Sequence, residues 1–185
     1  MRVQRPAPAG LAVLLAGVLA AGAAEAKVRM FAYDPANDET RHVAGPLTFE
    51  FRQKLVFNTI LAIRATEAKA TANLKPVDES TLGKGGLDPL IGANAPERDL
   101  YEIEPGDEGD AMVAAFCPGS KKGWASFGRL RANRDLRVRI LGDKPGGGVR
   151  LCHTLDFIYH GEWKAYEPTT VNPREVKVPH FPYGG

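Results

Sequence analysis

The segment from Leu47 to Phe57 constrains the fold more than any other part of the chain, because its side chains alternate in polarity. Its apolar members occupy odd-numbered positions and are Leu47, Phe49, Phe51, Leu55 and Phe57. The polar residues between them are Thr48, Glu50, Arg52 and Lys54. A period of two is typical of a β-strand that packs one face on a core and exposes the other face to water. The sequence therefore predicts a β-rich fold built around this strand.

Other segments predict further strands and one main helix. Short apolar segments bounded by turn residues indicate strands at residues 28–33, 59–65, 124–130, 136–141 and 150–163. Residues 66–74 contain alanines that favour a helix and threonines that favour a strand, so both assignments stay open. Residues 107–116 begin with acidic side chains and end before Pro118-Gly119, which is the pattern of a helix. We expect an α+β fold, β-rich, with a mostly antiparallel sheet or small sandwich and one main helix.

The first 26 residues have the layout of a secretory signal peptide. Arg2 and Arg5 precede an uncharged, Ala/Leu-rich stretch that ends at the small-x-small sequence Ala24-Glu25-Ala26. The alternative is a membrane anchor, but a spanning helix needs about 20 strongly apolar residues, and three glycines dilute this stretch. We expect cleavage after Ala26, or after Ala24, and export to the bacterial periplasm or the extracellular space.

Three parts are expected along the chain. Residues 1–26 are the signal peptide, residues 27–163 a single β-rich globular domain, and residues 164–185 a Pro-rich extended C-terminal tail. The mature part contains no apolar run that would span a membrane. The whole sequence has 24 basic and 22 acidic residues, and removal of Arg2, Arg5 and Glu25 leaves 22 and 21. A net charge this close to zero indicates no particular class of partner.

Cys117 and Cys152 are the two cysteines of the chain. In an oxidising compartment we expect them to form a disulfide. The disulfide would close a loop of about 35 residues. A loop of this length stabilises a fold by roughly 3 to 4 kcal/mol in the chain-entropy model. Two free thiols are the alternative, and the absence of a Cys-x-x-Cys sequence argues against a thioredoxin-like redox site.

Arginines gather in the predicted strands on either side of residue 133. A three-residue loop from Ala132 to Arg134 would place Arg129 opposite Arg137 and Phe127 opposite Arg139. The apolar residues nearby then require one shared face for Arg129, Arg131, Arg137 and Arg139. Such a face would bind an anionic partner, for example an envelope polyanion or an acidic protein. The alternative is an ordinary solvated sheet face.

The last predicted strand carries His153, Asp156, His160 and Glu162. Because side chains of a strand alternate between faces and rise about 3.3 Å per residue, His153 and His160 point to opposite faces and do not share a zinc ion. His160 and Glu162 have the same parity and would be neighbours on one face. His160 with Asp156 or Glu162 is therefore a candidate acid–base pair. We expect no metal site and no cofactor.

Two hypotheses for function follow from these residues. The preferred one is a non-enzymatic exported binding or interaction domain that contacts its partner through the arginine-rich sheet face. The alternative is a small exported hydrolase in which His160 and a nearby carboxylate transfer protons. The sequence specifies neither the ligand nor the substrate.

Overall fold

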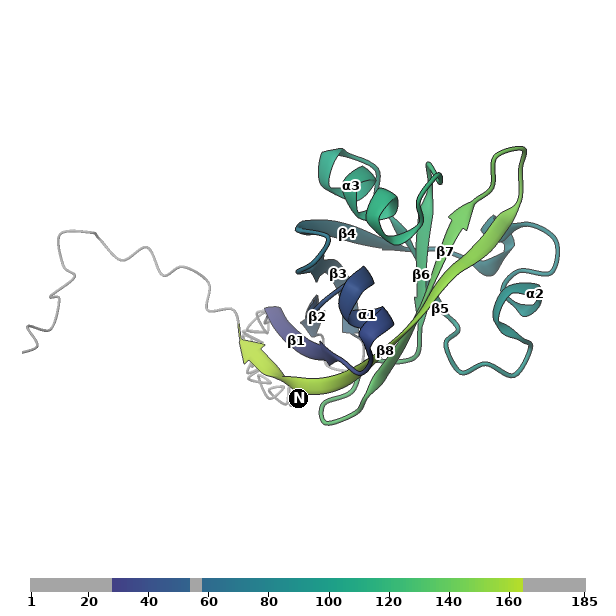
Figure 1. Cartoon of the computed structure of the whole chain (residues 1–185). Coiled ribbons are helices and arrows are strands. Elements are labelled where there is room, and N and C mark those ends of the chain that lie inside the picture. The colour runs from purple at the N-terminus through teal and green to yellow at the C-terminus, as the bar shows by residue number, and fades with distance from the viewer. Residues whose placement is uncertain (1–27, 54–57, 165–185) are drawn as a thin grey trace, which may run out of the picture.

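The chain folds into a closed antiparallel barrel of eight strands. The computed structural model describes residues 28–53 and 58–164, and the predicted signal peptide and nearly all of the predicted tail lie outside them. Each strand pairs with the next along the chain, and β8 pairs with β1 to close the barrel (Figure 1). The strands are β1 (Val28–Pro35), β2 (Leu47–Gln53), β3 (Asn58–Ala65), β4 (Ala70–Pro76), β5 (Asp99–Ile103), β6 (Gly123–Phe127), β7 (Leu136–Asp143) and β8 (Val149–Lys164).

In the described residues, four short helices lie in the connections between strands. They are α1 (Asp38–Val43), the 3-10 helix η1 (Glu79–Leu82), α2 (Asp88–Ile91) and α3 (Asp107–Phe116). The Asn37 side chain caps α1 by accepting a 2.8 Å hydrogen bond from the Thr40 backbone N–H. Among the helices of the described residues, none has the length and hydropathy needed to cross a membrane.

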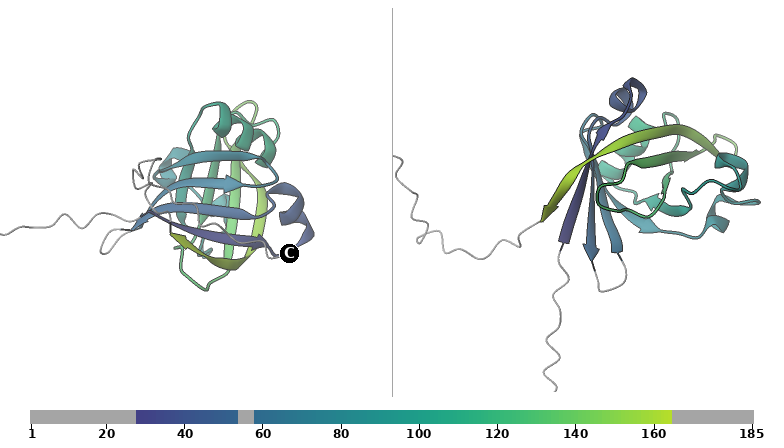
Figure 2. Two further views of the ribbon diagram at one scale, coloured as in Figure 1. Left: turned by 90° about the vertical axis from the view of Figure 1, so that its left-hand side faces the viewer. Right: turned by 90° about the horizontal axis from the view of Figure 1, so that it is seen from below.

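The expected sandwich with one main helix is wrong, because the sheet closes on itself. The reason is the length of β8, which runs for 16 residues. Its first part, up to Phe157, pairs with β7, and its second part, from Phe157 to Lys164, pairs with β1. Figure 2 (left) shows β1 to β4 side by side, crossing in front of the later strands. One long, curved strand therefore joins both groups into a single barrel.

The ambiguous segment 66–74 contributes most of β4. Ala70, Ala72 and Leu74 are buried, while Thr71 and Asn73 between them are more exposed. Pairing with β3 thus outweighs the helical preference of alanine. β5 was not expected from the sequence, because it lies in an acidic segment. β2 ends at Gln53, and residues 54–57 of the predicted strand lie outside the described residues.

Side chains fill the barrel. Aromatic rings contact one another in a series through the interior, which runs Phe51, Phe31, Tyr159, Tyr33, Phe49, Phe127 and Tyr101. The predicted helix 107–116 is confirmed as α3, and it adds Met112, Val113 and Phe116 to this core. A smaller cluster lies outside, where η1 and α2 pack Leu82 and Leu87 against the outer side of β5 to β7.

The predicted disulfide between Cys117 and Cys152 is present, with a Cα–Cα distance of 5.5 Å. It joins the residue that ends α3 to the first half of β8. Gly142 of β7 lies directly beneath it, and a Cβ atom there would collide with Cys117 Sγ and with the Ser120 side chain. The disulfide and a close backbone approach therefore hold α3 on the barrel.

Candidate functional site

A candidate site lies at the end of the barrel where β1 begins and β2 ends, which we call the mouth. The β6–β7 loop, residues 128–135, reaches the same end. α1 and α3 lie at the opposite end, because α1 joins β1 to β2 and α3 joins β5 to β6 there. The mouth is thus the end that neither of these helices covers.

A pocket of about 360 Å³ lies at the mouth, between the first two strands and the β6–β7 loop. Its lining, which we call the mouth pocket, consists of Arg29, Phe31, Phe51, Gln53 and the loop residues 129–132. The volume falls at the lower end of the range typical of small-molecule sites. Three of the lining residues are arginines and none is acidic, so the lining carries positive charge.

Two buried aromatic rings form the floor of the mouth pocket. Phe31 and Phe51 pack edge to face with ring centroids 4.7 Å apart. The Arg29 guanidinium carbon lies 5.9 Å from each centroid, within the range of a cation–π contact. Both rings are nearly inaccessible to water in the free protein.

Arg29 is held in place by two neighbours. Its Nε and Nη2 atoms each lie 2.5 Å from a carboxylate oxygen of Glu162, and its Nη1 donates to the Gln53 side chain. The hydrogen bond to Glu162 raises the pKa of Arg29 above its ordinary value. The charge of Arg29 is therefore balanced within the protein.

Glu162 reaches Arg29 because of a bulge in β8. Tyr159 pairs with Tyr33 and Glu162 pairs with Phe31, which leaves His160 as an extra residue. Cross-strand partners share a face, so Glu162 points inward with Phe31. His160 and Glu162 consequently lie on opposite faces, although their parity had predicted one face.

The β6–β7 loop supplies the opposite wall of the mouth pocket. Leu130 is 5% exposed and belongs to the barrel core. Arg129 and Arg131 on either side of it are exposed. Asp135 at the end of the loop accepts a 3.1 Å hydrogen bond from the Tyr159 backbone N–H. Leu130 thus anchors the loop, and its two neighbours present their charges to solvent at the pocket.

Arg129 and Arg131 differ from Arg29 in having no counter-ion. Within the part of the chain that the structure describes, no carboxylate lies within 4.0 Å of either guanidinium. An unpaired guanidinium presents several donors in a planar fork that suits carboxylates and phosphates. These two side chains are therefore the candidate anion-binding groups of the mouth pocket.

The structure separates the four arginines that the sequence placed on one face. β6 ends at Phe127, which pairs with Val138 in the core, while Ser126 pairs with Arg139. The loop has eight residues, 128–135, instead of three. Arg129 and Arg131 therefore lie at the mouth, whereas Arg137 and Arg139 lie on the outer side of β7.

Arg137 and Arg139 already have partners on the barrel wall. Arg137 Nε lies 2.6 Å from Asp156 Oδ1, and this hydrogen bond raises the pKa of Arg137. Arg139 donates to Thr154 at 2.8 Å and lies 3.6 Å from the buried carboxylate of Glu97. These contacts neutralise the sheet face that was expected to bind an anion.

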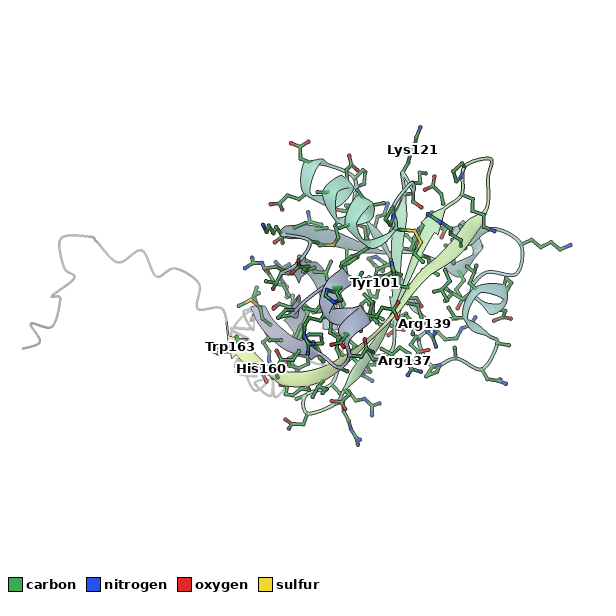
Figure 3. All side chains as sticks on the ribbon, viewed as in Figure 1. Tyr101, Lys121, Arg137, Arg139, His160 and Trp163 are labelled. Atoms are coloured by element: carbon green, nitrogen blue, oxygen red, sulfur yellow. A yellow bond between two sulfur atoms is a disulfide. The ribbon has the colours of Figure 1, made fainter. Side chains whose placement is uncertain are left out.

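The structure does not bring His160, Asp156 and Glu162 together. His160 Nδ1 lies 2.7 Å from Asp34 Oδ2 on the outer side of the barrel, and both side chains are 53% exposed. Asp156 is paired with Arg137, and Glu162 with Arg29. Figure 3 shows His160 well apart from Arg137 and Arg139. Across the described residues, no group of three or more His, Cys, Asp or Glu side chains is placed to hold a metal ion.

The sequence did not indicate Arg29, Phe31 and Phe51 as residues of a candidate site. A signal was present, because Arg29 has the same parity as Phe31 and Tyr33 and so falls on the inward face of its strand. A charged residue in that position needs a buried partner or an opening to solvent. Comparison of the chain with protein-family models, with curated proteins and with solved structures gives no match.

Proposed function

We propose that this protein is a non-enzymatic exported binding domain that holds a small anionic ligand at the mouth of its barrel. The observation that carries the proposal is the presence of two unpaired arginines, Arg129 and Arg131, in the wall of a 360 Å³ pocket. The mouths of barrels are among the places where small-molecule sites occur. Neither side chain has a carboxylate partner among the described residues. An anionic ligand can therefore pair with both guanidinium groups without displacing a carboxylate of the protein.

The charge distribution around the mouth supports the same ligand class. The lining of the mouth pocket contains three arginines and no carboxylate. Asp135 and Glu162 lie nearby, as does Asp99 at the start of β5, which pairs with Phe127. A pocket surrounded by an excess of one sign of charge concentrates ligands of the opposite sign and accelerates their association.

The filled interior favours the mouth over the lumen as the binding position. An eight-stranded barrel is just wide enough for side chains to fill, and here the series of rings from Phe51 to Tyr101 does so. A ligand that entered the lumen would have to displace packed aromatic side chains. The mouth pocket accepts a ligand without this rearrangement.

Titration with small anions tests the proposal. Inorganic pyrophosphate and octanoate are added to the mature protein, which lacks the predicted signal peptide. The side-chain Nε–Hε resonances of arginine are followed by NMR. We expect at least one of these anions to shift the Arg129 and Arg131 signals. Replacement of both residues (Arg129→Gln with Arg131→Gln) should weaken that binding by about tenfold or more, because each charge-assisted hydrogen bond contributes roughly 1.5 kcal/mol or more.

A control with the same change in net charge separates the mouth from a general charge effect. Arg41 of α1 and Arg64 of β3 are exposed and lie away from the mouth pocket. The double variant Arg41→Gln with Arg64→Gln should retain the wild-type affinity. Equal weakening in both double variants, or no binding of either anion by the wild type, would show that the mouth is not the site.

A further inference from the structure

We infer that the ligand of the mouth pocket is a small dianion with two separate anionic groups, one held by Arg129 and the other by Arg131. This inference rests on the proposed function and adds the chemical class of the ligand. It follows from the number of unpaired charges in the pocket lining and from the side of the loop on which they lie.

The side chains of Arg129 and Arg131 lie on the same side of the β6–β7 loop. Both are exposed, while Leu130 between them is buried in the barrel core. This alternation indicates an extended stretch of chain, in which every second side chain points the same way. The two arginines also line the same pocket. Their backbone positions are about 6.6 Å apart in an extended chain, which suits two anionic groups joined by a short linker.

Two of the three positive charges in the pocket lining are uncompensated. Arg29 is balanced by its carboxylate partner in β8, whereas Arg129 and Arg131 form no ion pair with any described residue. Asp99 and Asp135 lie at the same end of the barrel, but neither comes within 4.0 Å of these two guanidinium groups. A monoanion neutralises one guanidinium and leaves its neighbour unpaired. A dianion neutralises both.

The other polar side chain of the lining, Gln53, is also available as a donor. Its carbonyl oxygen accepts a hydrogen bond from Arg29, and no described residue accepts from its amide N–H groups. Among the described residues, no acidic side chain lines the pocket. The side chains therefore suit a ligand that carries several acceptor oxygens and no cationic group. Since the volume of about 360 Å³ lies near the lower bound for small-molecule sites, small dicarboxylates fit best.

Two probes that differ in one charge test the ligand class by calorimetry on the mature protein, which lacks the predicted signal peptide. Succinate carries two carboxylates, and succinamate has the same carbon skeleton with one carboxylate replaced by a neutral amide. Constant ionic strength keeps the screening of charges equal in both titrations. Succinate should bind about tenfold or more tightly than succinamate, because its second carboxylate accepts charge-assisted hydrogen bonds from the second guanidinium.

Single substitutions test whether each arginine holds one anionic group. In Arg129→Gln and in Arg131→Gln, the preference for succinate over succinamate should fall to about twofold or less, because one guanidinium remains for two carboxylates. The matched control is Arg134→Gln, which removes one exposed charge from the same loop but outside the pocket lining. This control should retain the wild-type preference. Near-UV circular dichroism checks that all three variants are folded.

The outcomes separate this inference from the proposed function. Equal affinities of the wild type for succinate and succinamate, both dependent on Arg129 and Arg131, would overturn the dianion and leave the anion-binding function in place. Binding of pyrophosphate without binding of succinate would have the same meaning, because the two anionic groups would then not be separated by a linker. A preference for succinate that survives in either single variant, or that is lost equally in Arg134→Gln, would also overturn the dianion. If the wild type binds none of these anions, the proposed function and this inference both fail.

Discussion

At the scale of single residues, neighbouring arginines of one strand have very different environments. Arg137 is half exposed, and its partner Asp156 is also accessible to water. Arg139 is largely buried and lies beside Glu97, which is 5% exposed. Arg139 Nε and Glu97 Oε2 are buried without a hydrogen-bond partner. The stability of the buried Arg139–Glu97 pair therefore depends on the attraction between its charges far more than that of the exposed Arg137–Asp156 pair.

This difference predicts unequal costs for the same substitution. Arg139→Gln leaves the Glu97 carboxylate buried without its counter-ion, and we expect a loss of about 3 kcal/mol or more in the free energy of unfolding. Arg137→Gln breaks an exposed pair, and we expect a loss of about 1 kcal/mol or less. Urea unfolding of both variants measures the two values. Similar losses for the two would mean that the burial of Glu97 does not govern this pair.

At the scale of elements, the contact of α3 with the barrel depends on two glycines. Gly123 begins β6 under Val113 of α3, where a Cβ would lie 2.7 Å from a Val113 methyl carbon. Gly142 of β7 lies under Cys117 and Ser120, as described above. The end of α3 thus packs on backbone instead of side chains. The close approach brings Cys117 within reach of Cys152 in β8.

Gly142→Ala should therefore loosen α3 and its disulfide. A methyl group at this position overpacks the contact, and we expect a loss of about 1 to 3 kcal/mol in the free energy of unfolding. Gly161→Ala in β8 is the control, because a Cβ there meets no atom within 4 Å, and it should change stability by about 0.5 kcal/mol or less. Thermal and urea unfolding distinguish the two. Equal stabilities would contradict the close approach at Gly142.

At the scale of the whole molecule, closure of the barrel and the disulfide act on different states. Pairing of β8 with β1 removes both sheet edges of the folded protein. The disulfide spans 35 residues along the sequence, from Cys117 to Cys152, and it restricts mainly the unfolded chain. The barrel therefore does not require the disulfide for its topology, although its stability depends on it.

Removal of the disulfide should lower stability and preserve the fold. For Cys117→Ser with Cys152→Ser we expect a loss of roughly 3 to 4 kcal/mol in the free energy of unfolding, from the loop-closure entropy. At room temperature, the far-UV circular dichroism spectrum should stay that of a β-rich protein. Urea unfolding with and without a thiol reductant measures the loss. A wild-type protein insensitive to reductant would contradict the stabilising role of this bond.

The sequence by itself determined the local features of this protein. The alternation from Leu47 to Gln53, the helix at 107–116 and the pairing of two lone cysteines were all readable, because each depends on neighbours in the chain or on simple counting. The leader's assignment as a signal peptide is of the same local kind, and it stays a prediction.

Only the tertiary structure decided closure, register and the composition of the mouth pocket. The polarity pattern indicates which face of the sheet a residue occupies within one strand. A bulge or a longer loop than expected changes the face that every later residue of the strand occupies. The bulge at His160 turned Glu162 toward Arg29, and the eight-residue loop moved Arg129 and Arg131 to the mouth. Pairing between distant strands fixes these positions, and no short stretch of sequence contains that information.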